Sequence, residues 1–255
     1  MTLGALKILL AEDNLTNQMV ATQMLESLGA QVTVASDGQE AMEMLERGVF
    51  DVALIDIEMP RISGVDLIRT LRTRGGKFAE LPMIALTAYV MREHRAAIDD
   101  AGADGIIAKP ILSIEQLGED ILAILQKSRN TVATPRRVAA SSLGSDIVVD
   151  EILFDELCSV FDDRRRDELL RKLSRDIGVA CGQIEGAQVT SDSEIIRSAS
   201  HVLISVSGTI GATRLQSLAQ CLNSAGHASD SQEIDRIAPE LIAEAERVLE
   251  FIDRG

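Results

Sequence analysis

The sequence predicts two domains of different class, an α/β domain followed by an all-α domain. Residues 1–128 alternate short apolar runs with amphipathic stretches five times, whereas residues 146–255 carry apolar residues at three- and four-residue steps throughout. Between them, residues 129–145 lose this periodicity and gather Pro, Ser, Thr and Gly, which is typical of a linker. A length of 255 residues suits two domains of ordinary size.

The α/β domain is predicted from five apolar runs that are rich in Val, Ile, Leu or Ala. These expected strands span residues 5–11, 30–35, 51–56, 81–88 and 104–109. Helical patterns follow them at residues 15–28, 39–47, 64–72, 90–100 and 114–126. Because near-continuous apolar strands alternate with helices, we expect a doubly wound parallel (βα)5 sheet with helices on both faces. If its strand order is the flavodoxin-like 2-1-3-4-5, the first and third strands are neighbours.

The region after the linker is predicted to form an antiparallel helical bundle. It contains four or five amphipathic segments that are separated by short joints of Gly, Ser and Asp. Helices with such short connections pack as antiparallel neighbours.

Composition narrows the function classes. The formal net charge is -15, shared between both halves, so the surface repels nucleic-acid phosphates and anionic lipid. Aromatic residues make up 2%, which disfavours base-stacking RNA binders. The three cysteines form no metal or redox motif, and no secretory signal or run of 18 apolar residues occurs. We therefore expect a cytoplasmic protein that binds neither nucleic acid nor membrane.

Carboxylate, hydroxyl and ammonium side chains stand at the carboxyl ends of the expected strands. Glu12 and Asp13 come after the first strand, Asp56 ends the third, Thr87 ends the fourth and Lys109 ends the fifth. In a parallel sheet these ends meet at one edge, so three carboxylates converge and require a cation. Oxygen ligands without His or Cys indicate Mg²⁺, and the hydroxyl and ammonium groups suit phosphoryl oxygens. For Asp13 alone, a solvated loop charge or a helix cap would be the simpler interpretation.

These residues lie in segments that resemble the receiver domain of two-component response regulators. The matching segments are LLAEDN (9–14), DIEMPRISG (56–64), LTA (86–88) and AKP (108–110). The resemblance covers residues 5–128, in order and at the right spacing, and implies a flavodoxin-like fold.

The resemblance also implies roles for individual residues. Asp56 would be the phosphorylated nucleophile, with Mg²⁺-dependent phosphoryl acceptance and self-dephosphorylation rather than metabolic catalysis. Thr87 would follow the phosphoryl group, Lys109 would pair with it, and Tyr89 matches the family's aromatic switch position. The implied ligands of Mg²⁺ are Glu12, Asp13, Asp56 and the backbone carbonyl of Glu58.

His201 is the candidate residue of the helical region. An apolar stripe places His201, Ser205 and Gly208 on the opposite face of its helix. The stripe consists of Ala199, Val202, Leu203, Val206 and Ile210. An ordinary surface histidine is the simpler interpretation of His201 taken alone. However, SASHVLISVSGTIGATRLQSLAQCL (198–222) resembles histidine phosphotransfer (HPt) domains, which implies that His201 carries a phosphoryl group.

Two positions depart from the HPt pattern. The family lysine three residues after the histidine is Ile204, and the glycine four residues after it is Ser205. We expect Ile204 to be an exposed apolar residue beside His201, where a partner could cover it.

Three functions remain open. The first is a phosphorelay protein in which Asp56 accepts a phosphoryl group from a sensor histidine kinase or HPt donor and His201 exchanges it with this or another receiver. The second is a phosphorylation-gated module whose degenerate bundle docks partners or forms a homodimer. The third is a phosphatase of another α/β family, which lacks support because Glu58 stands where its Asp-x-Asp motif requires aspartate.

Overall fold

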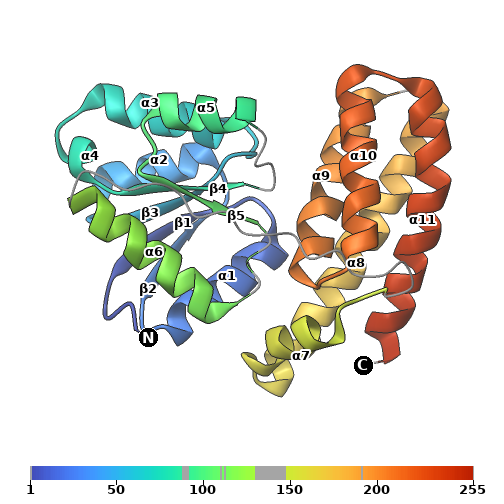
Figure 1. The fold of residues 1–255 in the computed structure, drawn as a ribbon, viewed down its shortest axis with the longest axis horizontal. Coiled ribbons are helices and arrows are strands. Elements are labelled where there is room, and N and C mark those ends of the chain that lie inside the picture. Colours follow the sequence, from blue (N-terminus) through green and yellow to red (C-terminus); the bar gives the residue numbers. More distant parts are fainter. Residues whose placement is uncertain are drawn as a thin grey trace. The chain divides into compact units, whose positions relative to one another are not determined.

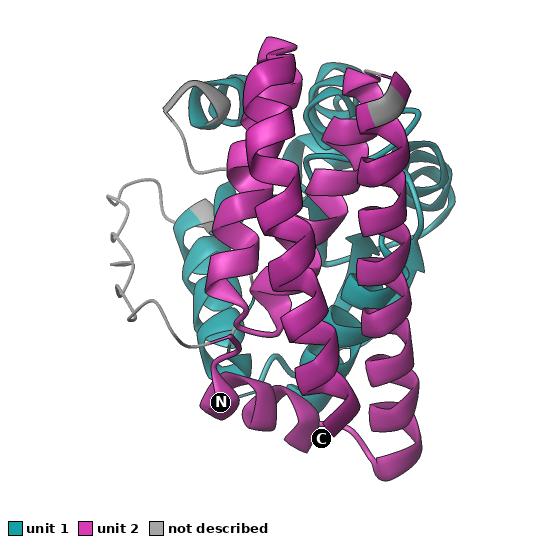
Figure 2. Cartoon of the chain, turned by 90° about the vertical axis from the view of Figure 1, so that its right-hand side faces the viewer, with its two compact units in different colours: residues 1–139 teal, residues 140–255 magenta. Residues whose placement is uncertain are grey.

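The computed structural model describes residues 2–87, 92–109, 111, 113–129, 148–190 and 192–254. The chain divides into two compact units, residues 1–139 and residues 140–255, which Figure 2 colours separately. Apart from Arg129, the predicted linker of residues 129–145 lies outside the described residues.

Unit 1 is built around a five-stranded sheet with strand order β2-β1-β3-β4-β5. All four strand pairings are parallel, as the sequence predicts, and the fold-class prediction is confirmed. The strands are β1 (Lys7–Ala11), β2 (Gln31–Ala35), β3 (Val52–Asp56), β4 (Met83–Thr87) and β5 (Gly105–Ala108).

Helices cover both faces of this sheet, with α1 and α6 on one side and α2, α3 and α5 on the other (Figure 1). Their bounds are α1 (Leu15–Ser27), α2 (Gly38–Arg47), α3 (Gly64–Arg74), α4 (Lys77–Glu80), α5 (Arg92–Ala101) and α6 (Ile114–Arg129). Side-chain caps start three of them, because Asn14, Asp37 and Ser63 accept hydrogen bonds from the first amides of α1, α2 and α3.

The core follows the two-residue period of the strands. Leu9, Ala53 and Ile55 face the side covered by α2, α3 and α5, where they pack with Leu67 and Leu71 of α3. Alternate strand residues point to the opposite side. Because both faces are covered, the central strands are buried along their whole length.

Helix α4 was not predicted. It is a single turn, too short to show a helical period. The side chain of Arg72 in α3 donates to its backbone. Arg72 donates to the carbonyls of Phe78, Leu81 and Gly102 and forms an ion pair with Asp104 at 2.5 Å. Asp104 in turn accepts the amide of Met83, the first residue of β4, at 2.7 Å. Arg72 thus ties α3 to the amino-terminal edge of the sheet.

In the described residues of unit 2, the regular elements are all helices. After the short helix α7 (Glu151–Ser159) come α8 (Asp163–Thr190), α9 (Ser193–Thr209), α10 (Thr213–Ala228) and α11 (Ser231–Arg254). Each of these four packs on the next, and α11 packs on α8, which closes a four-helix bundle (Figure 1).

The set of buried residues on α9 differs from the prediction. Ile204 is 0% exposed, so the expectation of an exposed apolar residue beside His201 was wrong. Ser205 and Gly208 are also buried, whereas Val202 of the predicted stripe is only partly buried. The physical reason is that α9 packs against both α8 and α10, so its buried arc is wider than a single stripe.

Among the described residues, no helix combines the length and the apolar character that a membrane crossing requires.

Candidate functional site

Strand register brings the predicted residues of unit 1 together. Ala11 pairs with Ile55, so Glu12 and Asp56 follow side by side at the carboxyl-terminal edge of the sheet. The amide of Lys109 donates to the carbonyl of Thr87 at 2.8 Å, which places these two residues next to each other at the ends of β5 and β4. Glu12 and Lys109, which are 97 positions apart in the chain, thereby lie in one pocket.

Lys109 connects two of the carboxylates. Its Nζ lies 2.5 Å from Oε2 of Glu12 and 2.6 Å from Oδ2 of Asp56. All three side chains are at least nine-tenths buried. An ammonium group with two buried carboxylates forms charge-assisted hydrogen bonds that fix the three groups relative to one another.

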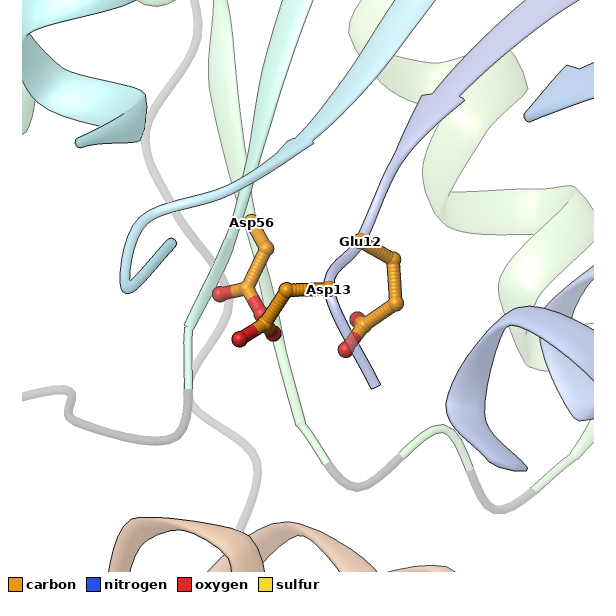
Figure 3. Close-up of side chains that lie close together, drawn as sticks. All are labelled: Glu12, Asp13 and Asp56. Atoms are coloured by element: carbon orange, nitrogen blue, oxygen red, sulfur yellow. The ribbon is translucent and has the colours of Figure 1, made fainter. Parts of the chain in front are cut away.

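Asp13 adds a third carboxylate. One oxygen from each of Glu12, Asp13 and Asp56 lies within 4.8 Å of the others, and Figure 3 shows the three side chains gathered at the strand ends. Two bare carboxylates at this separation repel each other by roughly 3 kcal/mol at an effective dielectric constant near 20. Lys109 compensates one negative charge, so the excess of oxygen ligands and of negative charge fits a hard divalent cation such as Mg²⁺.

The pocket shifts the pKa values of two groups. Burial raises the pKa of Glu12, aided by the charge of Asp56 and opposed by Lys109. Burial alone would lower the pKa of Lys109, but the charges of Asp56 and Glu12 outweigh burial and raise it. Lys109 therefore stays a cation throughout the neutral range.

Asn17 is a pocket residue that the sequence prediction missed. Its Nδ2 donates to Oε1 of Glu12 at 2.9 Å, so the two oxygens of Glu12 are held by α1 and by Lys109. Asn17 is the third residue of α1, and the signal that could have found it is its position three residues after the N-cap Asn14, on the same face of the helix.

The remaining predicted residues of unit 1 are placed as follows. Glu58 lies in the loop after β3 and is exposed, and its amide donates to Oδ1 of Asp56 at 3.2 Å. Thr87 is buried at the end of β4. Tyr89 lies outside the described residues, so the switch position is not seen.

His201 lies in the middle of α9 in unit 2 and is partly buried. Asn223 of α10 donates to the carbonyl of Arg197 at 2.9 Å and to the hydroxyl of Ser200 at 3.1 Å, one turn and one residue before the histidine. These two hydrogen bonds tie α9 to α10 beside His201.

The family comparison agrees with this geometry. Residues 8–122 match the family described as the response regulator receiver domain. These residues form a receiver domain. A receiver domain of this kind is part of two-component signal transduction.

Two curated relatives match more than the receiver. The sensory/regulatory protein RpfC of Xanthomonas campestris pv. campestris (strain 8004) is 28% identical over 215 residues, covering 84% of this chain and 29% of RpfC. The aerobic respiration control sensor protein ArcB of Escherichia coli (strain K12) is 28% identical over 226 residues, covering 88% of this chain and 28% of ArcB. Both alignments exceed the 139 residues of unit 1 and so extend into unit 2. The chain spans less than a third of the length of either relative.

Solved structures similar to the receiver cover about half of the chain. The receiver domain of the sensor histidine kinase PA1611 from Pseudomonas aeruginosa PAO1, described with a magnesium ion in its active-site cleft, is 33% identical. It covers 48% of this chain and 99% of that one, with a TM-score of 0.45. The Vibrio cholerae chemotaxis protein CheY4 is 27% identical, covering 48% of this chain and 99% of that one, with a TM-score of 0.44.

Proposed function

We propose that this chain is a phosphorelay protein in which Asp56 accepts a phosphoryl group and His201 exchanges one. Residues 1–128 would be the receiver, residues 129–145 the linker and residues 146–255 an HPt-like four-helix bundle, acting in the cytoplasm. The observation that carries the proposal is the buried Lys109 bridging Glu12 and Asp56 at the carboxyl-terminal edge of the receiver's sheet.

The phosphoacceptor step uses Asp56 as the nucleophile. A carboxylate oxygen of Asp56 attacks the phosphorus of a phosphohistidine on a sensor kinase or HPt donor. The new O–P bond forms as the donor's P–N bond breaks, and the electron pair leaves with the imidazole, which takes up a proton. Such a transfer needs positioning and charge stabilisation more than covalent chemistry.

The residues around Asp56 have distinct tasks in this step. Lys109 neutralises charge on the acceptor and on the incoming phosphoryl oxygens, and the Thr87 hydroxyl donates to one of these oxygens. Glu12, Asp13, Asp56 and the Glu58 carbonyl would hold Mg²⁺. When bound, Mg²⁺ supplies neutralisation of the phosphoryl oxygens that Lys109 alone cannot provide.

Phosphotransfer at His201 has narrower support. The alignments to RpfC and ArcB extend into unit 2, and His201 lies on α9 with part of its surface accessible. An imidazole nitrogen of His201 would attack the phosphorus of an acyl phosphate, and the Asp56 carboxylate, or that of another receiver, would leave with the electron pair.

One observation favours the second candidate function, in which the bundle only docks partners or forms a homodimer. Ile204 replaces the lysine of the HPt pattern and is buried, so this position supplies no cation to a phosphoryl group on His201. The degenerate-bundle function keeps Asp56 chemistry and assigns no phosphoryl group to His201.

A labelling experiment tests both functions. The full chain is incubated with Mg²⁺ and either a small phosphodonor or a phosphorylated HPt protein, alongside Asp56→Asn and His201→Gln variants. We expect an alkali-labile label that Asp56→Asn abolishes and an alkali-stable, acid-labile label that His201→Gln abolishes. Asp104→Asn, which alters a carboxylate at the opposite edge of the sheet, serves as the matched control and should keep both labels.

The outcomes separate the candidates. Label confined to Asp56, even with an HPt donor, would contradict the relay and support the docking module. No label on Asp56 with any donor would contradict both. Mixing the Asp56→Asn chain with the His201→Gln chain then shows whether transfer occurs between chains, because only intermolecular transfer restores the label on His201.

A further inference from the structure

The loop between β3 and α3 folds back on its own start. It spans residues 57–63 and begins directly after Asp56. The amide of Gly64 donates to the carbonyl of Ile57 at 2.9 Å, which closes the base of the loop. A Cβ on Gly64 would lie 2.0 Å from the carbonyl oxygen of Asp56, so only glycine permits this approach. The base of the loop is therefore anchored at the phosphoacceptor itself.

The tip of the same loop touches α2, a helix that contributes no residue to the acidic pocket. Gly38 is the first residue of α2, and a Cβ there would lie 2.2 Å from the carbonyl oxygen of Ile62 and 2.9 Å from its Cβ. Real Cβ atoms do not approach other atoms this closely, so a side chain at Gly38 would displace the tip. The first contact between helix and loop is thus a close backbone approach.

The second contact is an ion pair between Arg61 at the tip and Asp37 at the cap of α2. The Asp37 side chain is only 8% exposed. Its Oδ1 accepts the amides of Gln39 at 2.8 Å and Glu40 at 2.9 Å, while Oδ2 pairs with Arg61. One carboxylate therefore starts α2 and holds the loop.

Arg61 also has a left-handed backbone, with φ of 67°. This conformation is unfavourable for a residue with a Cβ and persists only where surrounding contacts impose it. The ion pair with Asp37 is such a contact, since it forms only while the tip lies against α2. Release of the ion pair would therefore favour another conformation of the tip.

We propose that Asp37 and Arg61 are positioning residues for the phosphoacceptor, holding the β3–α3 loop so that the backbone of Glu58 stays beside Asp56. The link is direct, because the Glu58 amide donates to Oδ1 of Asp56 at 3.2 Å. This inference rests on the proposed function of Asp56 and adds to that function a dependence on α2.

Four variants of the full chain test the proposal. Asp37→Asn keeps an acceptor for the cap of α2 and removes the charge. Arg61→Gly removes the ion pair and relieves the left-handed strain, so a loss there does not come from a strained fold. Gly38→Ala displaces the tip with the ion pair's residues intact. Arg61→Lys is the conservative variant, which keeps a cation opposite Asp37 and should therefore keep phosphorylation of Asp56 near the wild-type rate.

Three readouts apply to each variant: the rate of Asp56 phosphorylation by a small phosphodonor, the Kd for Mg²⁺ by calorimetry, and amide hydrogen exchange of residues 57–63. For the first three variants we expect about tenfold losses in rate and in Mg²⁺ affinity, with faster exchange in the loop. We expect Arg61→Lys to stay within about twofold of wild type. Arg69→Ala, which removes an exposed ion pair with Asp66 on α3, is the matched control and should change nothing.

The contrary outcomes are distinguishable. Wild-type rate, Mg²⁺ affinity and exchange in Asp37→Asn and Arg61→Gly would overturn the positioning role while leaving the proposed function standing. A wild-type chain that neither accepts a phosphoryl group on Asp56 nor binds Mg²⁺ would overturn the proposed function, and the positioning role with it.

Discussion

The two edges of the receiver's sheet hold opposite kinds of ionic cluster. At the amino-terminal edge, Arg72 meets one carboxylate, that of Asp104, and three backbone carbonyls, so the charges balance and the donors are satisfied. At the carboxyl-terminal edge, Lys109 meets two buried carboxylates with a third nearby, which leaves negative charge in excess. We expect the balanced cluster to stabilise the fold, and the unbalanced one to carry a repulsion that a bound cation would relieve.

The largest change in the free energy of unfolding is expected at the amino-terminal edge, where the charges balance. Arg72→Met should lower the free energy of unfolding by about 3 kcal/mol, because it leaves Asp104 without its cation and several carbonyls without a donor. Urea denaturation followed by circular dichroism measures this loss. The exposed Arg69→Met should cost less than about 0.5 kcal/mol. A loss below 1 kcal/mol for Arg72→Met would show that the amino-terminal cluster is not structural.

A cation should act only at the unbalanced edge. Mg²⁺ at a hundred times its Kd should raise the free energy of unfolding by about 2.7 kcal/mol, since it binds the folded state alone. Asp13→Asn should remove most of this gain, whereas Asp104→Asn should keep it. Thermal melts with and without Mg²⁺ report the difference. Equal stabilisation of both variants would place the cation elsewhere.

In the absence of metal, Asp13→Asn and Asp104→Asn should change the free energy of unfolding in opposite directions. Asp13→Asn should raise the free energy of unfolding by about 1 kcal/mol, because it relieves repulsion at a partly exposed carboxylate. Asp104→Asn should lower it. Denaturation in a chelator measures both, and destabilisation by Asp13→Asn would argue that the pocket carries no net repulsion.

The smallest effect concerns pH. The folded state raises the pKa of Lys109 above its ordinary value of 10.5, so Lys109 contributes stability that is fully present below that value and is lost as pH rises toward the folded pKa. Between pH 10 and 11 the wild type should lose roughly 0.7 kcal/mol more than Lys109→Met. Urea titrations at the two pH values provide the comparison. Parallel losses would mean that the carboxylates do not hold the ammonium group.

The unbalanced edge was easier to predict from the sequence than the balanced one. Glu12, Asp56 and Lys109 lie at or just after the carboxyl ends of apolar strands, and the ends of parallel strands meet at one edge, so a one-dimensional pattern suffices to bring them together. Arg72 sits inside an ordinary amphipathic helix, and its partners come from α4 and from the two connections that precede β4 and β5. Nothing in the local sequence marks such a residue, because only the packed fold defines its neighbours.

The bundle shows the same limit. Helical periodicity located α8 to α11, but the burial of Ile204, Ser205 and Gly208 depends on two neighbouring helices that flank α9. A single apolar stripe describes a helix that packs on one side. For α9 the number of neighbours, which sequence periodicity does not report, decided which residues are covered.

The hydrogen bonds to the pocket's carboxylates have a consequence for ion selectivity. Both oxygens of Glu12 accept hydrogen bonds, one from Asn17 and one from Lys109. Both oxygens of Asp56 are engaged likewise, by the amide of Glu58 and by Lys109. A bound cation would therefore share these oxygens with protein donors or reach them through water, which would leave few protein oxygens to contact it directly. Such a pocket would suit a small ion that keeps several of its water ligands, as Mg²⁺ does, better than Ca²⁺, which takes six to eight oxygens. The hydrogen bond from Asn17 would thus give α1 a part in the choice between these two cations.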